Sequence, residues 1–175
     1  MRKLKVHELS RLSPEEFQVS QKTPLVMVLD NVRSMHNVGA AFRIADAFLI
    51  EKLYLCGITA TPPHREIHKT ALGAEGHVTW AYTKDILPLV KRLKTEGYHI
   101  VAIEQTNTSQ SLYTASHLAR QKCAVVFGHE VLGIQEEVLA ACDTCLEIPQ
   151  RGVKHSLNVS VSMGIVVWEL TRRAR

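Results

Sequence analysis

Short apolar stretches without alternation constrain the fold of this chain most strongly. Residues 24–30 (PLVMVLD) and 123–128 (CAVVFG) are apolar almost throughout, instead of switching between apolar and polar at every second position. A strand of that composition is buried on both faces, which occurs mainly in parallel sheets covered by helices. The sequence therefore predicts an α/β fold with a mostly parallel sheet flanked by helices.

Further apolar segments alternate with segments of helical periodicity along the chain. With 175 residues, of which 46% are hydrophobic, the chain is expected to form a single domain over 1–175, with 1–20 as a short N-terminal extension. Ligands of parallel sheets bind beyond the carboxyl ends of the strands, so the segments that follow strands are the candidate sites. The predicted strands are 24–30, 52–57, 77–82, 98–104, 123–128 and 144–148, and the predicted helices are 37–49, 64–71, 85–96, 110–119 and 134–142.

The stretch 154–170 (KHSLNVSVSMGIVVWEL) fits two kinds of structure. Its first half alternates between polar and apolar residues, which is typical of a half-buried strand. However, the stretch as a whole also has apolar residues at helical spacing, namely Val161, Ile165 and Trp168. We therefore predict a helix from about Ser156 to Arg172, with a capping serine at its start. A stripe of small residues at i, i+4 spacing on this helix would allow another backbone to approach closely: Ser156, Ser160 and Gly164.

Two segments that follow predicted strands carry polar residues suited to ligand binding. Asn37 and Gly39 open one helix, and Arg43 follows among small and apolar neighbours. A helix N-terminus and an arginine together suit an anion such as phosphate, although a simple cap and an exposed arginine would look the same. Gly128 and Glu130 follow another strand, but neither segment matches a dinucleotide-binding fingerprint or a P-loop. A nicotinamide-dependent oxidoreductase is therefore disfavoured.

Cysteine and histidine spacing gives no support for a metal site. Cys142 and Cys145 form a lone C-x-x-C pair without the second pair that a structural zinc site needs, so packing explains them better. His64 and His68 have helical i, i+4 spacing, but the sequence offers no third ligand. We expect no structural metal.

Net charge and hydropathy limit which partners and which cellular compartment we expect for this chain. The net charge of +4, with basic residues gathered at both ends including 172–175, permits a nucleic-acid partner without requiring one. No apolar stretch approaches the roughly 18 residues of a membrane span, and the charged N-terminus lacks the apolar core of a signal peptide. We expect a cytoplasmic protein without a membrane partner.

Taken together, these segments resemble the three motifs of SpoU-type (TrmH-like) RNA 2′-O-ribose methyltransferases in the SPOUT superfamily. Asn37, Gly39 and Arg43 match the first motif, and Gly128 and Glu130 match the second. Residues 57–75 also resemble a subgroup of this family, and the resemblance extends from about residue 22 to the end. The third and most specific motif, I-P-x-x-G-x-x-x-S-L-N-V-S-V, is matched by Ile148, Pro149, Gly152, Ser156, Leu157, Asn158, Val159, Ser160 and Val161.

The resemblance implies a fold, a cofactor and a reaction. Members of this family form a parallel α/β sheet whose C-terminal part is threaded into a deep trefoil knot, and they act as homodimers. They use S-adenosyl-L-methionine to methylate a ribose 2′-hydroxyl in tRNA or rRNA. We favour tRNA because the stretch at 57–75 resembles tRNA-directed members. An rRNA-directed enzyme and a non-catalytic RNA-binding relative are the alternatives.

The resemblance also implies roles for individual residues. Arg43 is the expected base or phosphate clamp, although an arginine base is unusual because its pKa lies above ~12. The residues expected to orient this arginine and the nucleotide are Asn37, Glu130, Ser156 and Asn158. The residues expected to contact the cofactor are Gln105, Gly128, Ile148 and Leu157. Val131 and Gln150 depart from the residues frequent in relatives, which bears on cofactor contacts.

Overall fold

A parallel sheet forms the centre of the molecule, in a computed structural model that describes residues 1–5 and 8–172 and leaves the basic tail at 173–175 outside the described residues. The strands are β1 (Thr23–Asp30), β2 (Ile50–Cys56), β3 (Trp80–Thr83), β4 (His99–Ile103), β5 (Gln110–Ser111), β6 (Cys123–Phe127) and β7 (Thr144–Glu147). Within the described residues they form one seven-stranded sheet in the order β3-β2-β1-β6-β4-β7-β5, and each pair of neighbours is parallel. The predicted α/β class is confirmed.

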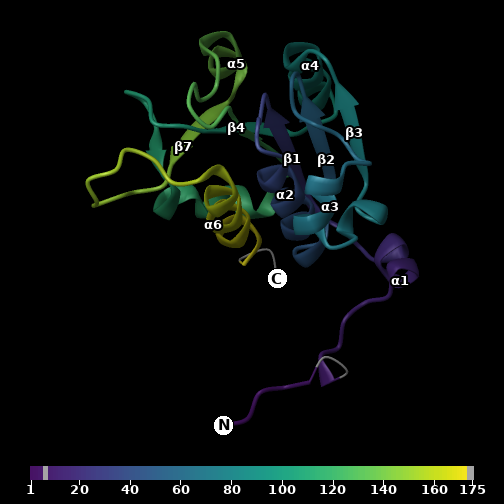
Figure 1. Cartoon of the computed structure of the whole chain (residues 1–175). Coiled ribbons are helices and arrows are strands. Elements are labelled where there is room, and N and C mark those ends of the chain that lie inside the picture. Colours follow the sequence, from purple (N-terminus) through teal and green to yellow (C-terminus); the bar gives the residue numbers. More distant parts are fainter. Residues whose placement is uncertain (6–7, 173–175) are drawn as a thin grey trace.

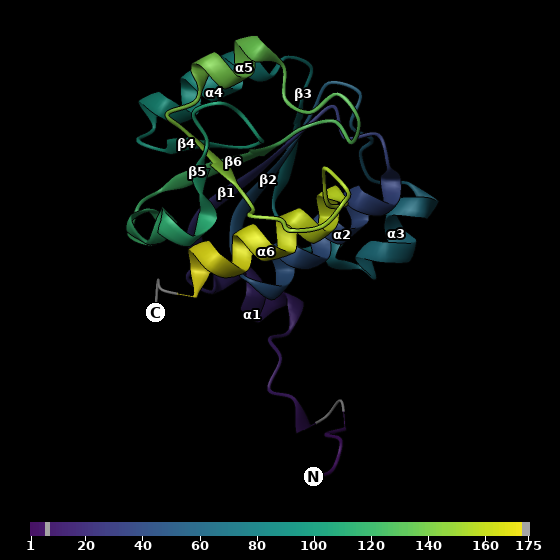
Figure 2. The ribbon, with the colours of Figure 1, turned by 90° about the vertical axis from the view of Figure 1, so that its left-hand side faces the viewer.

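The helices cover both faces of this sheet. They are α1 (Pro14–Val19), α2 (Met35–Ala47), α3 (Arg65–Ala71), α4 (Ile86–Thr95), α5 (Glu136–Ala141) and α6 (Val159–Thr171), together with the 3₁₀ helices η2 (Ala74–Gly76) and η3 (Leu112–Arg120). Figures 1 and 2 show α4 and α5 on one face, and α2, α3 and α6 on the other.

The central strand β1 shows why the apolar runs do not alternate. Met27 and Leu29 pack with α2, α3 and α6, whereas Val26 and Val28 pack with α4 and α5 on the opposite face. All four side chains are at most 2% exposed, and burial of each contributes about 1.5–3 kcal/mol to folding. The sequence pattern of β1 is therefore a consequence of its position between two helical layers.

The other predicted strands are confirmed, with ends that shift by one or two residues. Two predicted segments differ more from the structure. β3 begins at Trp80 and not at residue 77, because the amides of His77 and Val78 bond back to the carbonyl of Ala74 in the preceding 3₁₀ turn. The segment predicted as a helix over 110–119 is instead the short strand β5 followed by the 3₁₀ helix η3. Its buried residues recur every three positions, as a helix of three residues per turn requires: Leu112, Ala115 and Leu118.

The N-terminal segment contains a helix that was not predicted. Helix α1 begins with a capping box, in which the Ser13 side chain accepts from the Glu16 amide and the Glu16 side chain accepts from the Ser13 amide. Phe17 is buried, and the Gln18 side chain donates to the carbonyl of His77 at 2.6 Å. Part of the extension therefore packs against the body of the protein, while the described residues before α1 lead away from it (Figure 1).

The C-terminal helix is confirmed, but its beginning differs from the prediction. Helix α6 starts at Val159 and is capped by Asn158, whose Oδ1 accepts from the Ser160 amide at 2.9 Å. Ser156 lies in the exposed loop before the helix, so it is not the cap. A Cβ placed on Gly164 would meet no atom of another element of the described structure within 4 Å, so no described backbone packs closely there. Among the described residues, no helix is long and apolar enough to cross a membrane.

Candidate active site

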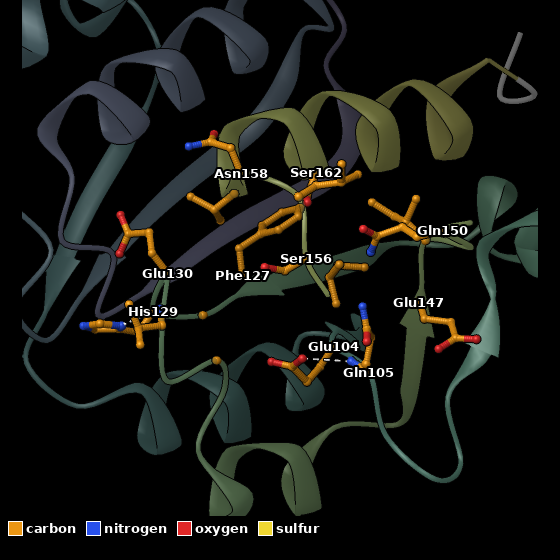
Figure 3. A pocket seen from close by; sticks show the side chains of 17 residues that line it. Glu104, Gln105, Phe127, His129, Glu130, Glu147, Gln150, Ser156, Asn158 and Ser162 are labelled. Atoms are coloured by element: carbon orange, nitrogen blue, oxygen red, sulfur yellow. Dashed lines mark hydrogen bonds between the residues drawn. The ribbon is translucent and has the colours of Figure 1, made fainter. Parts of the chain in front are cut away.

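A cavity of about 430 Å³ opens at the carboxyl ends of β4, β6 and β7 (Figure 3). This is the edge at which parallel sheets bind ligands, and the loop before α6 closes one side. The lining combines apolar side chains with three carboxylates, which belong to Glu104, Glu130 and Glu147. The other lining residues are Ile103, Gln105, Phe127, Gly128, His129, Val131, Gly133, Ile148, Gln150, Ser156, Leu157, Asn158, Val159 and Ser162.

Glu130 joins the loop after β6 to the beginning of α2. Its two oxygens accept from the backbone amides of Arg33 at 2.9 Å and Ser34 at 2.8 Å, and Oε1 also accepts from Asn37 Nδ2 at 2.9 Å. Burial alone would raise the pKa of the Glu130 carboxyl, but these donors outweigh burial and the pKa is lowered. Glu130 is therefore a carboxylate at neutral pH and only accepts hydrogen bonds.

Because Glu130 can only accept, it fixes the direction of a chain of amide groups. Asn37 donates Nδ2 to Glu130, so its Oδ1 is the acceptor that receives Asn158 Nδ2 at 3.3 Å. Asn158 then has its own Oδ1 free to accept from the amide and hydroxyl of Ser160. The first turns of α2 and α6 and the loop after β6 are thus held together by one directed network.

Two glycines allow the loop after β6 to fold tightly at the cavity. A Cβ on Gly128 would lie 2.5 Å from the backbone carbonyl of Gly133, closer than any real Cβ contact. Gly133 itself has a φ of 65°, and a Cβ there would lie 2.2 Å from a carboxylate oxygen of Glu104. Only glycine fits either position.

His129 holds the same loop through its ring. Its backbone exchanges hydrogen bonds with Gly133 at 3.1 and 2.9 Å, and its Nδ1 accepts from the amides of Val131 at 3.0 Å and Leu132 at 3.2 Å. A ring nitrogen that accepts carries no proton, so the neutral ring bears its proton on Nε2. His129 therefore shapes one wall of the cavity.

The end of β4 supports the opposite wall. Glu104 accepts from the amides of Gln105 at 2.8 Å and Ile134 at 3.2 Å, which links β4 to the segment before α5. The Gln105 side chain donates to the carbonyl of His155 at 2.7 Å, so it anchors the exposed loop that precedes α6. Gln105 thus has a structural bond in addition to its place in the lining.

The structure brings most of the predicted site residues to this cavity, but it leaves one apart. Seven of them line the cavity, and Asn37, which is 6% exposed, reaches it through Glu130. Arg43 is exposed on α2, outside the lining, and has no hydrogen bond or ion pair within residues 1–5 and 8–172. The seven lining residues are Gln105, Gly128, Glu130, Ile148, Ser156, Leu157 and Asn158.

Glu104 and His129 are site residues that the sequence reasoning did not assign. Glu104 is the last residue of the predicted strand 98–104, so the rule that directs attention to carboxyl ends of strands applied to it. His129 lies between two assigned residues, but the sequence offered no signal for the double acceptor role of its ring.

The histidines and cysteines that the sequence suggested as possible metal ligands make other contacts in the structure. No group of three or more His, Cys, Asp or Glu residues that could hold a metal ion occurs among the described residues. His64 caps α3 by accepting from the Glu66 amide at 3.1 Å, and His68 pairs with Glu75 at 2.5 Å. Cys142 at the end of α5 and Cys145 on β7 are free thiols that pack against the buried cluster on the α4 and α5 face.

Comparison with known proteins agrees with this arrangement. The profile of the SpoU rRNA Methylase family matches residues 24–168. A 23S rRNA (guanosine-2′-O-)-methyltransferase RlmB from Nitrosomonas europaea is 35% identical over 156 residues, which are 85% of this chain and 56% of that protein. The tRNA (guanosine(18)-2′-O)-methyltransferase of Thermus thermophilus is 28% identical over 95% of this chain and 84% of that protein.

Solved structures show the same fold. The A. aeolicus TrmH/SpoU tRNA modifying enzyme superimposes with a TM-score of 0.80 at 26% identity, covering 91% of this chain and 79% of that one. An AdoMet-bound rRNA methyltransferase from Sinorhizobium meliloti superimposes with a TM-score of 0.81 at 24% identity, covering 89% and 58%. The chain spans 56–66% of the length of several RlmB relatives that it matches. The chain belongs to the SpoU rRNA methylase family.

Proposed function

We propose that this protein is an S-adenosyl-L-methionine-dependent methyltransferase that modifies a ribose 2′-hydroxyl in tRNA. The observation that carries the proposal is the network of Glu130, Asn37 and Asn158, which joins three separate motif segments at one cavity. Family relatives are named as guanosine 2′-O-methyltransferases of rRNA and of tRNA. An rRNA ribose is the alternative substrate, supported by the RlmB relatives.

The residues present around the cavity fit the proposed cofactor. A volume of about 430 Å³ lies in the range of about 300–1,000 Å³ that cofactor sites occupy. When bound, S-adenosyl-L-methionine supplies a methyl group attached to a positively charged sulfur. The carboxylates of Glu104, Glu130 and Glu147 make the rim suitable for a cation, and the backbone at Gly128 allows close approach of a ligand. We assign Ile148 and Leu157 to contacts with the cofactor, and Gln105 holds the loop before α6 against it.

Arg43 is proposed to act on the RNA. A ribose 2′-hydroxyl is a weak nucleophile and must be positioned and lose its proton as it reacts. A guanidinium holds its proton too tightly to be a good base alone, so we assign Arg43 to binding a phosphate beside the 2′-hydroxyl, with the phosphate assisting removal of the proton. Its exposure and its freedom from partners within the described chain support this role.

We also propose that two copies of the chain form the working enzyme. One face of α6 presents Val161, Ile165 and Trp168 to solvent, and these side chains are 49%, 37% and 59% exposed. An apolar stripe of this kind marks an interaction surface, and the open space above Gly164 allows a second backbone to approach. A second copy bound here would also explain how Arg43, which does not line the cavity of its own chain, takes part in the reaction: it would face the cavity of the partner copy.

The dimer is tested by mass and by one substitution. Sedimentation should give about 39 kDa, twice the chain mass of 19.6 kDa. Trp168→Asp places a charge in the apolar stripe and should shift the protein to the mass of a single chain. A wild-type protein that sediments as a monomer at micromolar concentration contradicts the shared arrangement.

Three further features are proposed from the family. The chain is proposed to form a single domain over 1–175 with 1–20 as its extension, and the packing of Phe17 supports the view that this extension folds with the body. The segment from 148 to 158 is proposed to take part in a deep trefoil knot, which would fix the loop that closes the cavity. The cytoplasm is the proposed compartment, since RNA and the methyl donor are found there.

The function is tested by transfer of a labelled methyl group to RNA. The wild-type protein should label total RNA from a strain that lacks its gene, and mapping should place the label on one ribose of a tRNA. Replacing that ribose with a 2′-deoxyribose should abolish labelling. Labelling that persists on the deoxy substrate would show base methylation, and a label found on rRNA would favour the alternative substrate.

A further inference from the structure

A second cavity lies away from the candidate active site and shares no residue with it. Its volume is about 560 Å³, and its lining residues lie on and around β3 and α3, whereas the first cavity is lined from the ends of β4, β6 and β7. Figure 1 shows these two groups of elements at different places on the sheet. It is built mainly from the stretch 57–75, which none of the proposed catalytic roles uses. The lining residues are Pro62, Pro63, His64, Arg65, His68, Glu75 and Trp80.

The walls of this cavity suit a flat apolar ligand. The partly buried Trp80 ring is held by an edge-to-face contact with Phe42, with the ring centroids 6.3 Å apart at 89°. Pro62 and Pro63 provide a second wall of rigid rings. An immobilised indole ring that lines an open cavity offers a surface on which another planar ring can stack.

One side of the cavity offers a carboxylate with an unused oxygen. Glu75 accepts from His68 Nδ1 at 2.5 Å through Oε1, and its side chain is 16% exposed. Its Oε2 is buried and receives no hydrogen bond within the described part of the chain. A buried acceptor without a donor is costly, so a turn of the carboxylate that brings Oε2 to an amino group entering beside His68 would be favoured. Burial is the largest influence on Glu75 and raises its pKa, but the hydrogen bonds from His68 and from the backbone of Gly73 and Glu75, with the His68 charge, together outweigh burial and lower the pKa.

The histidines present opposite hydrogen-bonding groups. His64 Nδ1 accepts from the Glu66 amide, which places the proton of the neutral ring on Nε2 as a donor. His68 donates through Nδ1 to Glu75, which leaves Nε2 of the neutral ring as an acceptor. The cavity therefore lies beside both a donor and an acceptor, as recognition of a heterocycle edge requires.

Arg65 adds a positive charge at the same cavity. It is exposed at the first position of α3, and it makes no ion pair or hydrogen bond to any residue that the structure describes. The nearby carboxylate of Glu66 is already engaged by Lys69 at 2.7 Å and by His36 at 3.6 Å. The guanidinium of Arg65 is thus available for a phosphate group.

We propose that this cavity binds one unpaired nucleotide of the RNA substrate, away from the methylated ribose, with its base on Trp80 and its phosphate on Arg65. Proteins commonly recognise single-stranded RNA by stacking exposed bases on aromatic side chains and by reading their edges. Once the Glu75 side chain turns toward the cavity, its unpartnered oxygen selects bases that carry an exocyclic amino group, which guanine, adenine and cytosine have and uracil lacks. The proposal rests on RNA being the substrate.

Tryptophan fluorescence tests this site directly. The chain has two tryptophans, so Trp168→Phe leaves Trp80 as the single reporter. Guanosine 5′-monophosphate should quench Trp80, uridine 5′-monophosphate should bind at least about fivefold more weakly, and Arg65→Ala should weaken guanosine 5′-monophosphate about tenfold. Inorganic phosphate alone should leave the emission unchanged. Equal binding of the two nucleotides, or no quenching at millimolar concentration, overturns the proposal.

Methyl transfer provides the second measurement. Arg65→Ala should raise the KM for RNA about tenfold with kcat unchanged, because the site binds substrate without touching the reacting atoms. Lys91→Ala is the matched control, since Lys91 is an exposed cation on α4 at the opposite face of the sheet. Equal KM values for the two variants overturn the proposal. If the wild type transfers no methyl group while guanosine 5′-monophosphate still quenches Trp80, the proposed function fails and not this site.

Discussion

Asn37 and Arg43 lie on the same helix and belong to the same motif, yet their surroundings are opposite. Asn37 is 6% exposed, and both ends of its amide are bonded, to Glu130 and to Asn158. Arg43 is exposed and makes no polar contact with the described residues. The two residues therefore have different roles. Asn37 holds the elements around the cavity together, whereas Arg43 is free to bind a phosphate from outside the described chain.

Substitution of Arg43 should produce the largest change in activity. Arg43→Ala should lower methyl transfer by about 10²–10⁴-fold, since it removes the group that positions the phosphate and assists proton removal. The free energy of unfolding should change by no more than about 0.5 kcal/mol, because the side chain is exposed. Activity is measured by methyl incorporation, and cofactor affinity by calorimetry should stay within several-fold. Normal turnover would remove Arg43 from the mechanism.

Substitution of Asn37 should instead lower stability. Asn37→Ala leaves the Asn158 amide without its acceptor and removes one of the two hydrogen bonds that Glu130 Oε1 accepts, which should cost about 1–3 kcal/mol in the free energy of unfolding. Denaturant titration measures the change. His36→Ala is the control, because His36 lies beside Asn37 on α2 and its one ion pair among the described residues, with Glu66 at 3.6 Å, lies at the surface. Equal stabilities of the two variants would show that the network does not hold α2 to α6.

The smallest effect is expected at His129. His129→Ala removes the acceptor for the amides of Val131 and Leu132, so the loop should loosen and cofactor affinity should fall about three- to tenfold. His129→Asn should restore most of the affinity, because an asparagine oxygen can accept from the amide two residues later. Calorimetric titration distinguishes these results. Equal losses in both variants would point to a role of the ring beyond accepting these bonds.

Much of the fold followed from the sequence because both sides of β1 and β6 are buried. A strand between two helical layers must be apolar on both faces, so its amino-acid composition predicts its central position in the sheet. The strand β5 was not predicted, because its two residues, Gln110 and Ser111, are too few to show an apolar pattern. They form a strand only because they pair with β7. The start of α6 was misplaced because Ser156 and Asn158 are both good caps, and the contact of Asn158 with Asn37 decides between them.

The sequence by itself determined the α/β class, the family and seven of the residues that line the cavity. Tertiary structure decided which of them touch: a carboxylate that only accepts sets the direction of the Asn37 and Asn158 amides. It also decided that Arg43 faces outward and that Trp80, His68 and Glu75 enclose a second cavity. Residue type limits the chemistry that a side chain can do, but partners distant in sequence fix its protonation, orientation and access.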